Sequence, residues 1–204
     1  MPELAFRAVP NGAFTDAPGW TGLKTSAGTP ALAVETGRLK AVTTQLAESV
    51  ALLETQHRPD VTVIDAEFTF AGRRLRRDRG GVRIGAWGRS VIASHPEFPY
   101  GSCVLVVTPT DWSYSVFDPD QGAQVIKKGR FHPRLAADDV TVHRVEVRFD
   151  GTTAEITLPD GMIETVVDGR IGTWIRRVAA FELRHGPHRR DSRAAFVSVA
   201  SLPD

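Results

Sequence analysis

The stretch HRVEVRFDGTTAEITLPDG, residues 143–161, alternates apolar and polar side chains on both sides of an Asp-Gly pair. Side chains of a β-strand point to opposite faces with a period of two, so Val145, Val147 and Phe149 share one face. Asp150-Gly151 suits a two-residue hairpin turn with positive φ at both positions. The second half carries its apolar side at Ala154, Ile156 and Leu158. The pattern predicts an antiparallel β-hairpin.

The same alternation continues along the chain and predicts about a dozen strands separated by turn residues. Asp160-Gly161 predicts a turn before a third strand over residues 163–167, and Thr36-Gly37 predicts a turn between two early strands. The other predicted strands are 61–70, 82–93, 103–108, 112–117, 124–131, 173–183 and 195–200. Residues 41–56 also satisfy helical spacing, and we favour a strand near 50–55. Many short strands without alternating helices predict an all-β sandwich or jelly roll.

Length and composition set broad limits on the class of protein. The chain has 204 residues, 42% of them hydrophobic and 24% charged, with a formal net charge of +1. This size fits one domain over residues 1–204, and the charge gives no general attraction to nucleic acid or membrane. No signal peptide or membrane-spanning stretch is visible. The single Cys103 lies in an apolar run and is expected in the core.

Four segments carry a resemblance that covers the whole chain. They are FTDAPGWTGLKTSAGTPALAVETGRLKA, VTVIDAEFTF, the 143–161 stretch and WIRRVAAFELRHG, and they occur in the order seen in concanavalin A-like, laminin-G-like jelly rolls. The segment SCVLVVTPTDWSYSVF, taken with the 143–161 stretch, resembles modules of minor tail and other virion proteins of actinobacterial phages.

The resemblance implies a two-sheet antiparallel jelly-roll sandwich with a structural or adhesive role. We therefore expect a non-enzymatic virion protein of a phage, of the minor tail type, that binds other virion subunits, itself and possible host cell-envelope glycan. It would be made in the host cytoplasm without a signal peptide and reside in the virion. Capsid decoration is an alternative that differs only in the partner. Fold alone does not establish any of these roles.

One candidate binding face carries an aromatic ring between two arginines. Parity places Arg83, Trp87 and Arg89 on one face of a predicted strand. An exposed indole offers apolar area to a sugar ring or partner, and guanidinium groups add hydrogen bonds. Trp112 and Tyr114 share a face of a later strand and are expected in the core, whereas for Trp87 a core position and an exposed binding position both stay open.

A second candidate is a basic segment near a predicted turn. Residues 73–89 hold seven Arg and one Asp. Such a patch suits carboxylate or phosphate groups, because the guanidinium group binds both in bidentate geometry. The candidate interface residues are Arg73, Arg74, Arg76, Arg77 and Arg79. Little aromatic interleaving and no recognisable nucleic-acid module make nucleic acid an unlikely partner.

A rival hypothesis is a polysaccharide-cleaving enzyme on the same fold. Asp65 and Glu67 lie on one strand face about 7 Å apart, near the spacing used in glycoside hydrolysis. Jelly-roll glucanases carry a Glu-x-Asp-x-x-Glu pattern, which is incomplete here, so a third acid such as Glu97 or Asp111 would be needed. The alternative is a solvated sheet face, which we favour.

An alginate-lyase strand resembles VIKKGRF, with Lys127 and Gly129 in place. Phe131 stands where that chemistry needs a Tyr hydroxyl, so we do not expect lyase activity.

Two segments carry metal-ligating residue types, although no cofactor is expected. His185 and His188, with Asp191, suit zinc by chemistry, but Gly-Pro separates the two histidines and a surface loop is the simpler interpretation. Asp118 and Asp120 in FDPDQG offer oxygen ligands to calcium and equally form an Asp-Pro turn. We favour the turn.

Overall fold

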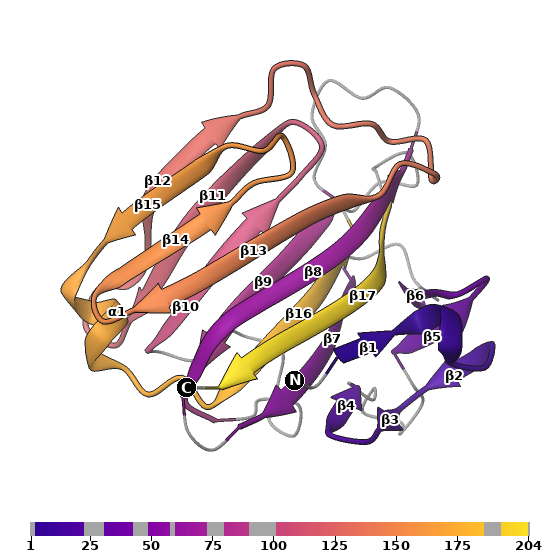
Figure 1. Cartoon of the computed structure of the whole chain (residues 1–204), viewed down its shortest axis with the longest axis horizontal. Coiled ribbons are helices and arrows are strands. Elements are labelled where there is room, and N and C mark those ends of the chain that lie inside the picture. The colour runs from indigo at the N-terminus through magenta and orange to yellow at the C-terminus, as the bar shows by residue number, and fades with distance from the viewer. Residues whose placement is uncertain are drawn as a thin grey trace.

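The computed structural model describes residues 3–22, 31–42, 49–57, 60–72, 80–89, 101–185 and 193–203. Its strands form two antiparallel sheets that lie face to face (Figure 1), which confirms the predicted two-sheet, concanavalin A-like sandwich. Two short helical segments accompany them, the 3-10 turn η1 (Phe6–Ala8) and helix α1 (Gly169–Thr173). Among the described residues no helix is long and apolar enough to cross a membrane.

The nine-stranded sheet contains the predicted hairpin at one edge. Its spatial order is β15 (Ile163–Val167), β14 (Thr153–Thr157), β13 (His143–Asp150), β8 (Val61–Ala71), β17 (Arg193–Pro203), β6 (Arg38–Ala41), β5 (Leu32–Glu35) and β2 (Gly12–Phe14), and β1 (Glu3–Ala5) pairs with β17.

The eight-stranded sheet lies against it. Its spatial order is β12 (Gly122–Arg130), β11 (Asp111–Asp118), β10 (Ser102–Val107), β9 (Gly81–Trp87), β16 (Val178–His185), β7 (Ser49–Gln56), β4 (Trp20–Gly22) and β3 (Asp16–Ala17).

The β13–β14 hairpin follows the sequence pattern in its faces and departs from it in its turn. Val145, Val147 and Phe149 are all buried, as alternation predicts. Asp150 pairs with Thr153, so the two loop residues are Gly151 and Thr152 rather than Asp150-Gly151. Of these only Gly151 has a positive φ, +52°. A glycine adopts this conformation without a Cβ clash, which explains why the turn forms one residue later.

The core fills the space between the sheets with aromatic and branched side chains. Phe181 of β16 meets Phe196 of β17 edge to face, with ring centroids 6.0 Å apart, so the contact joins the two sheets. Trp20 of β4 packs on the same Phe181 at 5.7 Å. Cys103, Trp112 and Tyr114 are buried in this cluster, as predicted. Close packing of this kind supplies most of the free energy that stabilises a sandwich.

The edge strands β12 and β15 close one side of the sandwich (Figure 1). Lys127 of β12 forms an ion pair with Glu164 of β15, with Nζ and Oε2 2.6 Å apart. The same ammonium group donates a hydrogen bond to the backbone carbonyl of Thr165 at 3.1 Å. A single lysine therefore occupies a main-chain acceptor on the open edge of the nine-stranded sheet.

The structure decides two predictions about where strands lie, one near residues 50–55 and one over 173–183. The favoured strand near 50–55 is confirmed by β7, while residues 43–48 lie outside the described residues. The strand predicted over 173–183 begins only at Val178, because residues 169–173 form α1. The Asp168 carboxylate accepts a hydrogen bond from the backbone N–H of Arg170 and caps this helix. The local cap overrides the strand pattern around Thr173.

Candidate functional site

A row of polar side chains crosses one edge of the eight-stranded sheet. Asp16 of β3 pairs with Thr21 of β4, and Thr21 pairs with Glu54 of β7. Their neighbours Ala17, Trp20 and Thr55 alternate with them and face inward. The three side chains therefore share the outer face of the sheet, on neighbouring strands that are about 4.8 Å apart.

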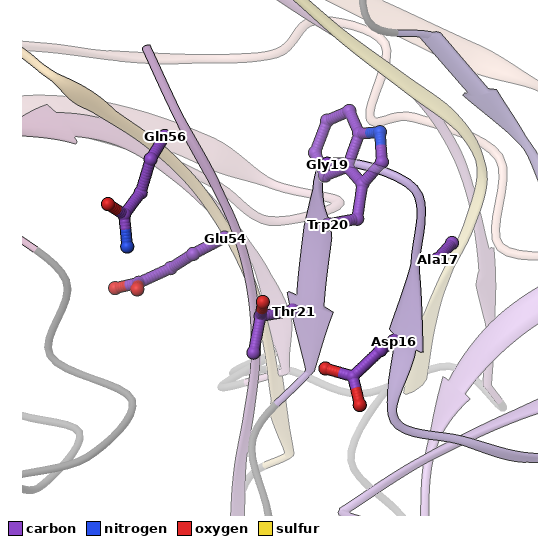
Figure 2. A pocket seen from close by; sticks show the side chains of 7 residues that line it. All are labelled: Asp16, Ala17, Gly19, Trp20, Thr21, Glu54 and Gln56. Atoms are coloured by element: carbon purple, nitrogen blue, oxygen red, sulfur yellow. The ribbon is translucent and has the colours of Figure 1, made fainter.

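A pocket of about 390 Å³ lies at this row. It is lined by Asp16, Ala17, Gly19, Trp20, Thr21, Glu54 and Gln56. Figure 2 shows Glu54 and Gln56 projecting to the same side of β7 beside Thr21, while the Trp20 ring points away from them. The lining thus brings together two carboxylates, an amide and a hydroxyl, which are groups that recognise hydroxyl-bearing ligands.

The Glu54 carboxylate is buried and oriented by an indole from another part of the sequence. Its side chain is only 2% exposed, and its Oε1 accepts a hydrogen bond from Nε1 of Trp87 at 3.2 Å. Trp87 belongs to β9, and strand β16 lies between β9 and β7. The indole therefore extends across β16 on the outer face.

Small residues under the indole leave it the room to lie there. A Cβ added at Gly85 would come within 3.2 Å of the Trp87 ring and 2.7 Å of the Cys103 carbonyl oxygen. Ala180 of β16 pairs with both Gly85 and Glu54, so it lies between them in the sheet. A glycine and an alanine in this row permit the ring to approach the backbone closely.

A second buried acid on the same face is paired with a cation. Glu182 of β16 is 2% exposed and lies opposite Arg83 of β9. Nη1 of Arg83 donates to Oε1 of Glu182 at 2.9 Å. Buried charges require such pairing, because removing either partner leaves an uncompensated charge. This ion pair joins β9 to β16 on the same outer face as the Trp87–Glu54 contact.

These contacts bear on the predicted binding face of Arg83, Trp87 and Arg89. Trp87 is only 1% exposed and packs with Leu52, Val104 and Val178, so the expected exposed indole is wrong. Both faces of β9 are buried, and a buried ring offers no surface on which a sugar can stack. Arg89 is exposed just beyond the strand. Ligand binding by Arg83 and Arg89 stays a prediction.

The predicted basic interface cannot be placed. Arg73, Arg74, Arg76, Arg77 and Arg79 lie outside the described residues. Their role stays a prediction from the sequence.

The two carboxylates of the predicted hydrolase site lie on the outer face of the other sheet. Asp65 binds the guanidinium group of Arg144 through Nε and Nη2, and Ser198 donates to Glu67 Oε2 at 2.9 Å. Arg144 is 60% exposed while the Asp65 side chain is only 12% exposed, so the solvated sheet face that we favoured holds for the arginine and not for Asp65. Asp111 begins β11 on the eight-stranded sheet and bonds Thr108 and Thr110, while Glu97 lies outside the described residues. Glu146 of β13 lies opposite Asp65 and forms ion pairs with Arg144 and Arg148, so the acid nearest to this pair is also engaged by arginine.

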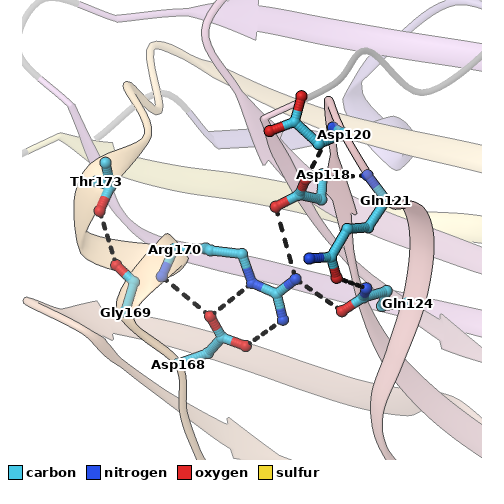
Figure 3. Close-up of polar contacts among 8 residues, drawn as sticks. All are labelled: Asp118, Asp120, Gln121, Gln124, Asp168, Gly169, Arg170 and Thr173. Atoms are coloured by element: carbon cyan, nitrogen blue, oxygen red, sulfur yellow. Dashed lines mark hydrogen bonds and ion pairs between the residues drawn. The ribbon is translucent and has the colours of Figure 1, made fainter.

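The Asp118–Asp120 segment, predicted as a turn or a calcium site, forms a turn and contacts Arg170 (Figure 3). Asp118 Oδ1 accepts the backbone N–H groups of Asp120 and Gln121, which is the turn geometry. Its Oδ2 faces Nη1 of Arg170 at 3.7 Å. Arg170 also makes a bidentate pair with Asp168, and this guanidinium group lowers the pKa of the Asp168 carboxyl. A carboxylate shared with a turn and an arginine does not fit a calcium ligand set.

The remaining chemical candidates are also occupied or outside the described residues. His188 and Asp191 lie outside them, and the described part of the chain has no group of three or more His, Cys, Asp or Glu placed to hold a metal ion. Burial raises the pKa of the Cys103 thiol to about 11, which disfavours the reactive thiolate. Phe131 is buried at the position where a lyase requires a hydroxyl.

The sequence pattern did not single out Asp16, Thr21, Glu54 and Gln56. The two from β7 lie in the segment that helical and strand spacing fit equally well, and β3 and β4 are only two and three residues long. Strand parity in β7, with buried Leu52 and Leu53 on opposite faces, is the one signal that could have shown a sheet covered on both sides.

The two sheets and their order form a two-sheet antiparallel jelly-roll sandwich with a concanavalin A-like fold. No protein-family model and no curated protein matches the chain in sequence. Among solved structures, the fold is similar to the carbohydrate recognition domain of Emp47p, with a TM-score of 0.68 and 9% identity over 98% of this chain and 94% of that chain.

Two further solved structures have a similar fold. The CBM2 module of the evolved Dit of Lactobacillus casei BL23 phage J-1 has a TM-score of 0.64 and 12% identity, covering 98% of this chain and 93% of that chain. The Ca²⁺-bound exoplasmic/lumenal domain of VIP36 has a TM-score of 0.63 and 8% identity, covering 99% and 90%. At these identities the likeness concerns the fold.

Proposed function

We propose that this chain is a glycan-binding module whose binding site is the pocket at the β3–β4–β7 edge. The observation that carries the proposal is the row of Asp16, Thr21 and Glu54, which lines this pocket together with Gln56. Carboxylate oxygens accept hydrogen bonds from sugar hydroxyls, and the amide both donates and accepts them. Hydrogen bonds to charged groups are about twice as strong as neutral ones, which favours a polyhydroxylated ligand.

The fold supports a recognition role. The similar structures include a carbohydrate recognition domain, a CBM2 module and a VIP36 domain solved with Man and with Man₃GlcNAc. These titles describe those proteins, and they make binding the first activity to test here. We propose that the chain acts by binding alone, because Asp65 and Glu67 are engaged by Arg144 and Ser198.

A glycan array followed by calorimetry on the best saccharide tests the pocket. Glu54→Gln keeps the shape of the side chain and removes its charge, so it should weaken binding by roughly 10-fold or more. Thr21→Val removes one hydroxyl and should weaken binding several-fold. Glu155→Gln, on the exposed outer face of the nine-stranded sheet, is the matched control and should bind as the wild type does. Equal affinity of all four proteins would contradict the pocket.

We further propose that the module serves as a recognition subunit of a phage virion, of the minor tail type, contacting other virion subunits and copies of itself. The support is the resemblance carried by the 143–161 stretch and the structural likeness to a module of a phage Dit. Immunogold electron microscopy of intact virions tests this location. Label on the tail supports it, label on the head favours capsid decoration, and unlabelled particles exclude both.

A further inference from the structure

The size of the pocket limits how much of a glycan it accepts. Its 390 Å³ equal the liquid volume of about thirteen water molecules, at about 30 Å³ each. A hexose has roughly a dozen non-hydrogen atoms, each comparable in size to a water molecule. The pocket therefore has room for one sugar unit.

The aromatic side chains near the pocket do not form a stacking platform. Among the described residues that line it, Trp20 is the one aromatic residue, and it is 3% exposed and packs on Phe181 in the core. Trp87 is buried too. A sugar in this pocket is thus held by hydrogen bonds from its hydroxyls at the ring edge, and not by contact of a ring face with an indole.

Trp87 nevertheless affects the pocket, because its hydrogen bond orients Glu54, one of the residues that line it. Its Nε1 holds Oε1 of Glu54 across strand β16, and the Glu54 side chain is buried. A carboxylate held in one rotamer before binding loses less side-chain entropy when a ligand hydroxyl arrives.

From these contacts we infer that the pocket binds a single terminal monosaccharide unit through its hydroxyls, and that Trp87 is a positioning residue for Glu54. The inference rests on the proposed glycan-binding function and adds to it the class of ligand and the residue behind the site. Trp87, which the sequence suggested as a direct contact, acts here through Glu54.

The first experiment compares small and large ligands on the full chain. Methyl pyranosides of glucose, galactose, mannose, rhamnose and N-acetylglucosamine are titrated as competitors against the best glycan from the array. At least one methyl pyranoside should compete with a Kd within about 10-fold of the Kd of that glycan. Binding to the glycan without competition by any monosaccharide overturns the single-unit inference and leaves glycan binding intact. No binding on the array at all refutes the proposed function itself.

The second experiment is a double-mutant cycle between the two side chains. Trp87→Phe removes the N–H donor and keeps a ring, so it should weaken saccharide binding by about 5- to 10-fold. Added to Glu54→Gln, it should cause little further loss, because both changes disrupt one contact. Unchanged affinity in Trp87→Phe, or a full additional loss in the double variant, overturns the positioning role. Trp174→Phe, in a partly buried tryptophan outside the pocket lining, is the control.

A measurement on the wild type covers the case in which Trp87→Phe does not fold. The indole N–H resonance of Trp87 is assigned by its displacement in Glu54→Gln and followed by NMR during titration with the best methyl pyranoside. A shift of this resonance at saturation supports the contact, since the acceptor oxygen belongs to a carboxylate that binds the sugar. An unshifted resonance in a protein that binds the sugar overturns it.

Discussion

At the residue scale, the outer face of the eight-stranded sheet depends on where side chains are missing as much as on those that are present. The Trp87 indole reaches Glu54 because Gly85 offers no Cβ beneath the ring. The same glycine lies close to the Cys103 carbonyl oxygen of the next strand. One small residue thus sets both the spacing of two strands and the orientation of a buried acid.

Gly85→Ala should therefore destabilise the protein by about 1–3 kcal/mol, the usual cost of overpacking a filled interior. Urea denaturation gives the free energy of unfolding that checks this. Gly169→Ala is the matched control, because a Cβ at Gly169 meets no atom within 4 Å. The same destabilisation in both variants would show that steric crowding at Gly85 is not the cause.

Asp138 gives a residue-scale prediction on pH. The backbone N–H of Thr141 and then that of Val140 lower the pKa of its carboxyl from 3.8 to about 2. A carboxyl with a depressed folded-state pKa stabilises the protein above its unfolded pKa and loses that contribution as the pH falls through its folded pKa. The contribution should be complete above about pH 4 and lost by about pH 2.

Asp138→Asn keeps an oxygen acceptor for the same N–H groups and removes the titration. The difference in unfolding free energy between wild type and variant should shrink between pH 4 and pH 2. Parallel stability curves for the two proteins over this range would contradict the assignment.

At the element scale, strands with one solvated face could be predicted from the sequence, and strands buried on both faces could not. Alternation placed Val145 and Val147 correctly, because the opposite face of β13 carries charged residues. In β9 the same parity grouped Trp87 with Arg83 correctly, but both faces of this strand are covered, so the inferred exposure was wrong. A pattern of polarity shows the face of a residue and does not show what packs against that face.

The candidate site shows the same limit. Its row joins β3 and β4 to β7, and the Trp87 partner of Glu54 is 33 positions away in sequence. Such pairings are set by the order of strands in the sheet, which one sequence does not reveal. The short helix α1 was missed for a different reason, since a single capping side chain, Asp168, decided it.

The contact between α1 and the β11–β12 hairpin yields an element-scale prediction. Arg170 binds both oxygens of Asp168 and donates to Oε1 of Gln124 on β12 at 2.7 Å. These groups are partly shielded from water, so Arg170→Ala should lower the free energy of unfolding by about 1 kcal/mol. Arg148→Ala removes an ion pair whose arginine is 58% exposed and should leave the stability nearly unchanged, because water screens such a pair. Thermal or urea unfolding of both variants distinguishes a partly buried network from an exposed ion pair.

At the scale of the whole molecule, one core cluster contains side chains of both sheets, and Phe181 and Phe196 meet across it. Neither sheet can expose its inner face without exposing that of the other. We therefore expect cooperative unfolding of residues 1–204 as a single domain, with tryptophan fluorescence and far-ultraviolet circular dichroism changing at one urea concentration. Two separated transitions would indicate two independently stable units instead.

Lys127, which lies between the edge strands β12 and β15, affects how copies of this chain associate at high concentration. An uncovered edge strand presents main-chain groups to which a neighbour's strand can add, and growth by such addition has no natural end. Lys127 occupies the Thr165 carbonyl and carries a charge to that rim. The edge strand β15 is therefore protected at this point. Neighbouring copies are expected to contact each other there through side chains and not through backbone hydrogen bonds between their sheets.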